Sequence, residues 1–401
     1  MNKKKQIIIL VLAILITAVF TFSITVNYYL PVSAMSKEGI SQDEIINRLA
    51  PLINVIKAVD SRYIEDVEID KMIIGAIKGA VNSIDDPYAA YFTPEEFNDF
   101  IASIQGAFEG IGISVTMDED GIVRVISPIE DTPGHKAGIL PDDRIVQIDD
   151  TAVKGLTLDE AVNLMRGPKG SKVVLHIKRE GEKDTLVFEI VRAKIELKTV
   201  KHSVLEDSIG YIKITSFDES TPKEFKSALK TLSKQKVKGL ILDLRNNPGG
   251  LLKESTEIAD ELIGESLIVY TEDKAGNKTS AYKSDKNKIK IPLVVLVNKY
   301  SASASEIVAG AVQDTESGII VGTRTFGKGS VQEPILFNDG SGLKLTTAKY
   351  YLPSGRSIHG IGIEPDILID LPENVNPFDI PIGSDTQLQK GVEILNEEIK
   401  N

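Results

Sequence analysis

The stretch from residue 292 to 321 constrains the fold of this chain most, because it reads as a strand, a helix and a second strand. The apolar run PLVVLV occupies 292–297, a helical pattern follows over 304–314, and a β-branched run lies at 319–321. Strand, helix and strand in about 30 residues is the size of one βαβ unit. The strands of such a unit run parallel, so their carboxyl ends lie at the same edge of the sheet.

Two reactive groups follow these carboxyl ends. The serine-rich turn SASAS at 301–305 comes after the first strand, and a glycine-flanked lysine, Lys328, comes after the second. A hydroxyl and an amine that are far apart in the sequence can therefore meet in space. We predict that Ser303 and Lys328 form a catalytic pair.

The composition of the chain limits what else it can do. Its 401 residues, 42% of them hydrophobic, are enough for two or three domains. The net charge of −12 disfavours nucleic acid as a partner, because phosphate binding needs a basic face. Cysteine is absent, which excludes disulfides, thiolate metal sites and a cysteine nucleophile. With only four histidines, a histidine-rich metal site is not expected either. Hydrolysis by a serine and a lysine would imply no metal and no cofactor.

Residues 1–34 are predicted to be a targeting segment. Three lysines at 3–5 precede a long apolar stretch, and no charged residue lies between 6 and 35. Such a stretch can span a bilayer with the lysines on the cytoplasmic side, so we expect an uncleaved, single-pass membrane anchor. The tripeptide VSA at 32–34 also resembles a cleavage site, which makes a removed signal peptide the alternative. Either way, the rest of the chain is expected to be exported and to work outside the cytoplasm.

The remainder divides into four regions. Residues 35–105 have apolar side chains at helical spacing and are predicted to be an N-terminal helical region with no obvious chemistry. Residues 106–196 form a second unit, 197–372 an α/β core, and 373–401 a tail with an amphipathic helix over 386–400. The terminal helices could pack on the core or make a homodimer, and the sequence leaves this open.

Residues 106–196 resemble a PDZ domain, an α+β unit built as a partly open β-barrel. The resemblance rests on the GIGI run at 110–113 and the AGILPDDRI run at 137–145. It implies that backbone N–H groups of a glycine-flanked loop bind a peptide's terminal carboxylate, while the peptide adds a strand to the sheet edge. That loop would be formed by Gly110, Ile111, Gly112 and Ile113, and its apolar side chains would favour substrates with apolar C-termini. The alternative is a small structural domain that binds nothing.

Arg166 stands at the end of the helix expected over 157–165 in this unit. In the simpler interpretation it is a solvated charge that suits the carboxyl end of a helix. In the other it reaches a second domain and reports that a peptide is bound, which makes it a candidate for regulation.

In the core, a glycine loop follows another buried strand. The apolar run GLILDL at 239–244 is typical of a parallel strand, and RNNPGG at 245–250 follows its carboxyl end. The amides of Gly249 and Gly250, together with that of Ala304 at a helix N-terminus, could hold a developing oxyanion.

Ser303 and Lys328 also have less reactive interpretations. Ser303 and Glu306 fit a capping box, in which the serine only begins a helix. A lone glycine-flanked lysine is usually a surface residue. To act as a base, Lys328 needs its pKa lowered from about 10.4 to roughly 7–8, which burial among apolar groups would do. Gln332 could orient the amine without adding a charge.

Taken together, three segments resemble the carboxyl-terminal processing proteases, the tail-specific serine peptidases. They are DLRNNPGG at 243–250, SASASE at 301–306 and GKGSVQ at 327–332, and YLPSGR at 351–356 and DPY at 86–88 fit the same pattern.

The resemblance assigns roles to individual residues. It implies that Ser303 is the nucleophile, Lys328 the base and Gln332 the third member of the site. It also implies a serine endopeptidase with parallel βαβ units in its core and an inserted PDZ domain that recruits substrate C-termini and gates activity. Terminal helices that often make dimers complete the expected architecture.

The competing interpretation is a non-catalytic, membrane-anchored PDZ module that binds exported C-termini. An inactive relative would be expected to have lost the serine or the lysine, and this chain has both.

Overall fold

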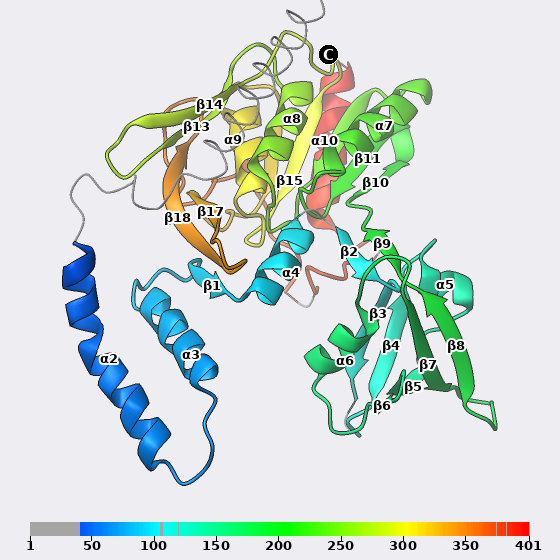
Figure 1. The fold of residues 1–401 in the computed structure, drawn as a ribbon. Helices are drawn as coiled ribbons and strands as arrows, with labels where there is room; N and C mark the ends of the chain where they lie inside the picture. The colour runs from blue at the N-terminus through cyan, green and yellow to red at the C-terminus, as the bar shows by residue number, and fades with distance from the viewer. Residues whose placement is uncertain (1–40, 105–106, 119, 374, 382, 401) are drawn as a thin grey trace, which may run out of the picture. The chain divides into compact units, whose positions relative to one another are not determined.

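The computed structural model describes residues 41–104, 107–118, 120–373, 375–381 and 383–400 (Figure 1). The predicted targeting segment at 1–34 lies outside these residues. None of the helices in the described ranges is long and apolar enough to cross a membrane. Contacts within the chain separate two compact units, Met1–Ile77 and Lys78–Asn401.

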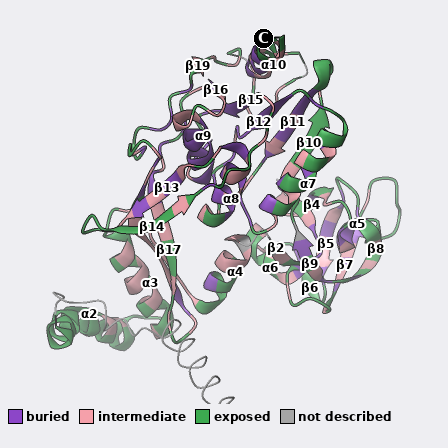
Figure 2. Cartoon of the chain, turned by 90° about the horizontal axis from the view of Figure 1, so that it is seen from above, coloured by how far each residue is buried: buried purple, intermediate pink, exposed green. Residues whose placement is uncertain are grey.

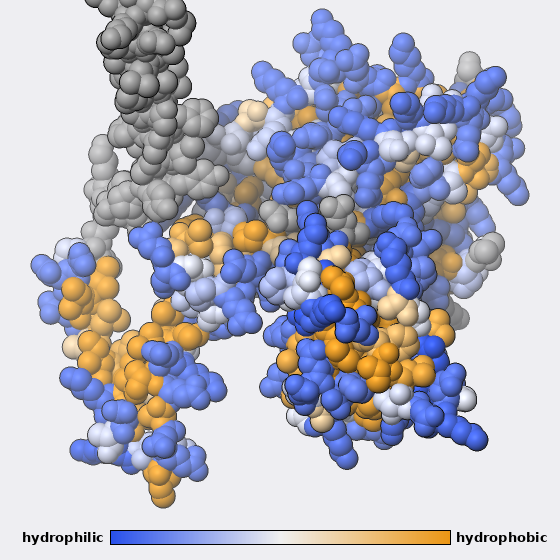
Figure 3. Space-filling view, turned by 45° about the vertical axis from the view of Figure 1, so that its right-hand side comes forward, coloured by the Kyte–Doolittle hydropathy of each residue, from blue (hydrophilic) through white to orange (hydrophobic). Residues whose placement is uncertain are grey.

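The described part of the first unit is helical. Helix α2, Gln42–Arg62, begins at Ser41, whose hydroxyl accepts a hydrogen bond from the Glu44 amide (3.2 Å). Helix α3, Ile69–Asn82, follows and continues into the second unit. No residue of α2 is buried, and its apolar side chains lie on the surface (Figure 3). The exposed ones include Ile45, Ile46, Leu49, Leu52, Ile53 and Val55.

The unit at 106–196 contains a six-stranded sheet in the order β3-β4-β5-β7-β8, with β6 paired to β5. Its strands are β3 (Ile113–Met117), β4 (Val123–Pro128), β5 (Arg144–Ile148), β6 (Thr151–Ala152), β7 (Lys172–Lys178) and β8 (Leu186–Val191). Its helices are α5 (Pro133–Ala137) and α6 (Leu158–Met165), and α6 begins with a capping box between Thr157 and Glu160. Strands β2 (Ala107–Gly110) and β9 (Ala193–Glu196) pair where the chain enters and leaves the unit. The order leaves β3 at an edge of the sheet.

The core is built on a second six-stranded sheet, in the order β10-β11-β12-β15-β16-β19. The strands are β10 (Val200–Val204), β11 (Ile209–Ile214), β12 (Gly239–Asp243), β15 (Leu293–Val297), β16 (Ile319–Gly322) and β19 (Ile367–Leu368), and a 3₁₀ turn, η2 (Glu206–Ser208), joins the first two. All neighbours from β11 to β19 pair in parallel, and only β10 is antiparallel. Helix α9 (Ala304–Asp314) connects β15 to β16, so the carboxyl ends of these strands lie at one edge.

Helices cover both faces of this sheet because side chains alternate along each strand. Leu240, Leu242, Val295 and Val297 join the cluster formed with α7 (Thr221–Lys234), α8 (Leu252–Leu262) and α9. The intervening residues Ile241, Val294 and Leu296 pack instead against Ile394 and Leu395 of α10 (Thr386–Lys400). In Figure 2, β12, β15 and α9 are coloured largely as buried.

A separate, five-stranded sheet lies beside the six-stranded sheet of the core. It has the order β1-β18-β13-β14 with β17 paired to β18, and consists of β1 (Ala90–Phe92), β13 (Leu267–Glu272), β14 (Lys278–Lys283), β17 (Ser330–Leu336) and β18 (Gly342–Tyr351). Residues 35–105 are predicted to be helical, and α4 (Pro94–Ile104) is a helix as expected. Strand β1 is the exception, since three residues are too few for a strand pattern. Through β1, the segment before α4 belongs to the same sheet as β18.

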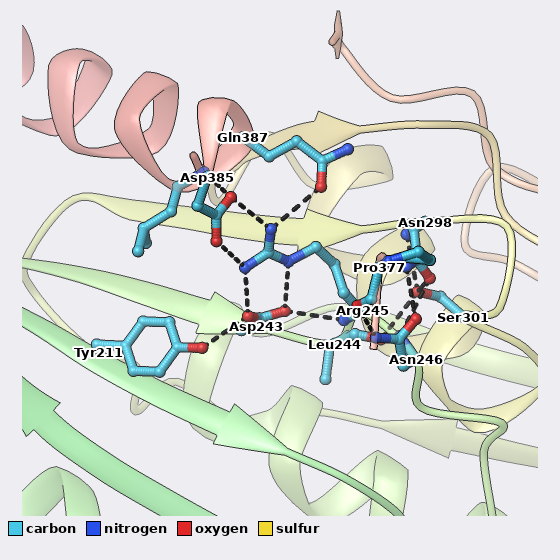
Figure 4. A network of polar contacts seen from close by, with 11 residues as sticks. Tyr211, Asp243, Leu244, Arg245, Asn246, Asn298, Ser301, Pro377, Asp385 and Gln387 are labelled. Atoms are coloured by element: carbon cyan, nitrogen blue, oxygen red, sulfur yellow. Dashed lines mark hydrogen bonds and ion pairs between the residues drawn. The ribbon is translucent and has the colours of Figure 1, made fainter. Parts of the chain in front are cut away.

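The C-terminal helix is tied to the core by a buried arginine (Figure 4). The Arg245 guanidinium bonds Asp243 Oδ2 and Asp385 Oδ1, each at 2.7 Å, and Gln387 Oε1 at 3.1 Å. Asp385 and Gln387 lie at the start of α10, and Arg245 lies two residues after the end of β12. Of the two possibilities left open for this helix, the structure shows packing on the core, so its buried face is not available to a second subunit.

We predict that Leu395→Ala lowers the free energy of unfolding by about 2–5 kcal/mol, because Leu395 is fully buried between α10 and the sheet. Urea denaturation of the fragment from residue 41 onward measures this. Glu398→Ala, an exposed position of the same helix, is the matched control and should change stability little. A loss no larger than that of the control would contradict the docking of α10.

Candidate active site

Of the three serines in the SASAS turn, the structure leaves Ser303 accessible. Ser301 and Ser305 are fully buried. The Ser301 hydroxyl donates to the Leu244 carbonyl (2.8 Å), and the Ser305 hydroxyl donates to the Asn247 carbonyl (2.9 Å). Ser303 is only half-buried and lines a cavity. The flanking serines therefore hold the turn against the glycine loop, and the middle one faces the open space.

The backbone of Ser303 is strained. Its φ of 53° and ψ of −113° lie outside the regions that residues with a side chain normally adopt. Such outliers persist only where the surroundings enforce them, and they concentrate at functional sites. The sequence gives no direct signal of this conformation.

The cavity beside Ser303 has a volume of about 390 Å³ and mostly apolar walls. The walls include Phe217, Leu251, Ile307, Val331 and Tyr350. Polar groups are few, and among them are Ser303, Gln332 and Lys344. A cavity of this kind can take an apolar side chain while its backbone lies at the Ser303 hydroxyl.

Glu306, in the first turn of α9, connects the serine turn to the loop that carries Lys328. Its carboxylate is fully buried and accepts hydrogen bonds from the amides of Ser303 (2.8 Å), Gly327 (2.7 Å) and Lys328 (2.9 Å). The Thr325 hydroxyl also donates to it. Burial raises the pKa of Glu306, although these hydrogen bonds oppose the rise. The predicted capping box is thus present, and the same carboxylate also binds the loop that carries Lys328.

Tyr350 on β18 makes a second link between the same two loops. Its hydroxyl donates to the Lys328 carbonyl and lies 3.3 Å from the Ser303 carbonyl. Burial raises the pKa of Tyr350 well above its ordinary value, so the phenol keeps its proton. Glu306 and Tyr350 therefore fix the backbones of Ser303 and Lys328 relative to each other.

The Lys328 side chain lies in a partly buried position. Burial and the nearby charge of Lys344 lower the pKa of Lys328, while Asp86 and Glu306 act in the opposite direction and leave it below its ordinary value. Lys328 Nζ lies 4.4 Å from the centre of the Tyr88 ring. Within the described ranges, the ammonium makes no hydrogen bond or ion pair, to Ser303 or to any other residue.

Gln332 lies close to these residues without contacting the lysine. Its side-chain amide donates to the Ser330 hydroxyl at 3.0 Å and to the Thr346 hydroxyl at 3.4 Å. It also lines the cavity with Ser303. The fold thus brings Ser303, Lys328 and Gln332 into one region. Within the described residues, no hydrogen bond joins their side chains.

The glycine loop differs from the expectation in one detail. The Gly249 amide donates to Asn247 Oδ1 (2.9 Å), so it is already engaged and does not point freely at a substrate. Gly249 lies so close to Ser303 that an added Cβ would stand 2.9 Å from the Ser303 Cβ. Gly250 lines the cavity, as does Ala304. The amides of Gly250 and Ala304 therefore stay the candidates for holding an oxyanion.

In the PDZ-like unit, the predicted peptide loop adopts a turn. Gly110 ends β2 and Ile113 begins β3, so Ile111 and Gly112 form the connection between the two strands. The carbonyls of Ile111 and Gly112 accept hydrogen bonds from Gly134 (2.7 Å) and Ile129 (2.9 Å). Among the described strands β3 pairs only with β4, so it has one unpaired edge.

Arg166 follows α6 and reaches residue Asp99 on α4, outside the PDZ-like unit. Its Nη1 lies 3.4 Å from Asp99 Oδ2, and both side chains are largely exposed. An exposed pair of this length contributes little stability, so the contact can be exchanged for another at small cost.

No group of three or more His, Asp or Glu side chains in the described ranges could hold a metal ion.

Comparisons with known proteins give the family. Residues 208–369 match peptidase family S41, 110–190 match the PDZ domain, and 16–96 match the activating protease CtpB N-terminal domain. The chain is 40% identical to a carboxy-terminal-processing protease of Bartonella bacilliformis over 91% of its length and 85% of that protein. The chain belongs to the carboxy-terminal processing proteases. The resemblance predicted from the sequence is thereby confirmed.

Other members of the family are similar over most of the chain. The carboxy-terminal processing protease CtpA of Bacillus subtilis is 38% identical over 90% of this chain and 77% of that protein. The solved photosystem II D1 C-terminal processing protease is 30% identical, covers 84% of this chain and 95% of its own, and superposes with a TM-score of 0.49. As a member of this family, the chain is a serine-type endopeptidase with a PDZ domain.

Several residues at the site could not be found from the sequence. Glu306 is predicted only to cap a helix, and Tyr350 and Lys344 are predicted only to lie in a strand. Tyr88 stands in the DPY run at 86–88, which fits the family pattern but was given no role. This run was the one signal in the sequence that could have pointed to Tyr88.

Removing the Lys344 charge should raise the pKa of Lys328, because a neighbouring positive charge disfavours the ammonium form. A lysine acts as a base only as the neutral amine. With Lys328 as the base, the role proposed for it below, we expect the acid limb of the pH profile of kcat/KM to move to higher pH in Lys344→Gln. Lys349→Gln, an exposed position of the same strand, should leave the limb in place. A limb that moves to lower pH in Lys344→Gln would contradict this assignment of charges.

Proposed function

We propose that this protease cleaves peptide bonds with Ser303 as nucleophile and Lys328 as general base. The observation that carries the proposal is the position of Ser303. It is the accessible serine of its turn, on a strained backbone, beside an apolar cavity and a lysine loop fixed to it by Glu306.

The chemistry follows from these positions. Neutral Lys328 takes the proton of the Ser303 hydroxyl as the oxygen attacks the carbonyl carbon of the substrate. The amides of Gly250 and Ala304 hold the resulting oxyanion, an interaction worth about 3–4 kcal/mol per donor in serine proteases. The Lys328 ammonium then protonates the leaving amine, which leaves an acyl-enzyme on Ser303. Water, deprotonated by the same lysine, releases the second product.

Gln332 would act through its carbonyl oxygen. Its amide nitrogen is occupied by Ser330 and Thr346, so Oε1 is the atom that can accept a hydrogen bond from the Lys328 ammonium. An uncharged acceptor can orient the amine without raising its pKa as a carboxylate would.

The catalytic pair is tested by two substitutions. Ser303→Ala and Lys328→Ala should each reduce kcat by roughly 10⁴-fold or more, as removal of a nucleophile or base does elsewhere. The assay is cleavage of an unfolded protein with an apolar C-terminus, with circular dichroism to show that each variant is folded. Ser305→Ala is a matched control for the serine turn. Because Ser305 is buried, the free energy of unfolding of this variant is measured alongside its activity. Cleavage that persists in Lys328→Ala would rule out the lysine as base.

The PDZ domain is proposed to bind the substrate's apolar C-terminus along the open edge of β3. Support comes from the unpaired edge of β3. We also propose that Arg166 reports this binding by exchanging its contact with Asp99 for one that depends on the peptide.

Arg166→Ala should then uncouple cleavage from the C-terminal sequence. We expect the ratio of kcat/KM for substrates ending in apolar and in charged residues to fall toward one, with Lys154→Ala on the same domain as the control. A ratio unchanged from that of the unmodified protein would exclude Arg166 as the reporter.

Three further expectations rest on the sequence alone. Export and a membrane anchor depend on residues 1–34, which lie outside the described residues. A homodimer stays a prediction, and because α10 is packed on the core it would use the exposed apolar side of α2.

A further inference from the structure

The segment Asp86-Pro87-Tyr88 fits the family pattern but has no part in the mechanism above. In the structure it forms a turn before β1, and its aromatic ring lies under the catalytic lysine. Lys328 Nζ is 4.4 Å from the centre of the Tyr88 ring. This is within the distance at which a cation is attracted to the face of an aromatic ring.

The turn at Asp86–Tyr88 is hydrogen-bonded to the hairpin formed by β17 and β18. Asp86 Oδ1 accepts a hydrogen bond from the Tyr88 amide (2.9 Å), and the Thr346 hydroxyl on β18 also bonds Asp86. Two residues later the chain joins β18, with Ala90 opposite Lys344. Thr346 in turn stands opposite Gln332 in the β17–β18 pairing. The turn is therefore placed by the same strands that place the catalytic residues.

The groups that face Lys328 have opposing effects on its charge. Tyr88 and Asp86 on the turn, and Glu306 on α9, favour the ammonium form. Lys344 on β18 and burial disfavour it. Burial raises the pKa of Asp86, but the hydrogen bonds from Thr346 and Tyr88 and the two lysine charges lower it overall, so its carboxylate is charged and can act on Lys328.

We propose that Tyr88 and Asp86 are positioning residues that hold Lys328 as an ammonium in the resting enzyme, away from the Ser303 hydroxyl. Lys328 becomes the base only when it gives its proton to water and leaves the Tyr88 ring for Ser303. Deprotonation and release are coupled, because the ring attracts the ammonium and has no comparable attraction for the neutral amine. The proposal rests on the proposed roles of Ser303 and Lys328.

The proposal is tested by measuring the pKa of Lys328 itself. In a Ser303→Ala background, the rate at which an amine-specific reagent modifies Lys328 is followed against pH by peptide mass spectrometry. Tyr88→Leu keeps the apolar bulk and removes the ring face, so the pKa of Lys328 should fall by about 0.5 to 1. Asp86→Asn removes the charge and keeps the side-chain shape, and should lower the pKa as well.

Two variants serve as matched controls. Tyr88→Phe retains the ring face and should keep the pKa of Lys328 nearly unchanged. Asp85→Asn changes an exposed neighbouring carboxylate at a backbone conformation that Asn also tolerates, and should have no effect.

The same variants are then made with Ser303 intact. Tyr88→Leu should move the acid limb of kcat/KM to lower pH and raise activity on that limb by about 3- to 10-fold, with little change on the alkaline plateau. A purely structural role would lower activity at every pH and leave the limb where it is.

The outcomes separate this proposal from the function it rests on. An unchanged or raised pKa of Lys328 in both Tyr88→Leu and Asp86→Asn overturns the proposal, even if Lys328→Ala is inactive. Cleavage that persists in Lys328→Ala overturns the proposed function, whatever the pKa of the lysine.

Discussion

The buried carboxylate of Glu306 is the interaction on which the active site depends. It lies at the first turn of α9 and receives hydrogen bonds from three backbone amides and the Thr325 hydroxyl. Parallel pairing brings the ends of β15 and β16 to one edge of the sheet, but this alone places the two loops only approximately. Glu306 fixes their distance, because a buried carboxylate left without these donors would cost several kcal/mol. One of these hydrogen bonds comes from the amide of Ser303, whose backbone is strained.

A second buried charge controls the glycine loop. Arg245 is held between Asp243 at the end of β12 and Asp385 at the start of α10 (Figure 4). Burial raises the pKa of Asp243, but hydrogen bonds and charge from Arg245 lower it overall, so the pair is charged. Removing one partner of such a group is typically destabilising by about 3–5 kcal/mol. The loop from 245 to 250 therefore depends on the C-terminal helix, which is a structural part of the protease core.

Local patterns made much of this fold predictable. The run at 304–314 gives α9 and the run at 144–148 gives β5, because each has enough residues for its period to be read. Ser303 and Lys328 could be paired because strand ends in a βαβ unit share an edge. The family resemblance also pointed to Ser303, the middle serine of its turn. The structure shows a physical reason, since the two flanking serines are buried and hydrogen-bonded.

The remaining features depend on contacts between distant parts of the chain. Strand β1 is too short to show a period, and its pairing with β18 is what brings Tyr88 to Lys328. The partners of Arg245 stand at 385 and 387, where nothing in the local sequence signals a buried ion pair. The engagement of the Gly249 amide by Asn247 depends on the detailed shape of one loop. Such features follow from tertiary packing, which no single segment encodes.

The central claim is that peptide cleavage passes through an acyl-enzyme on Ser303. The most direct test is to quench the reaction of the protease with an activated peptide ester and locate the acyl group by peptide mass spectrometry. We expect an adduct on Ser303, formed faster as pH rises through the pKa of Lys328 and absent from Lys328→Ala. An adduct on Ser301 or Ser305, or one that forms as fast without the lysine, would contradict it.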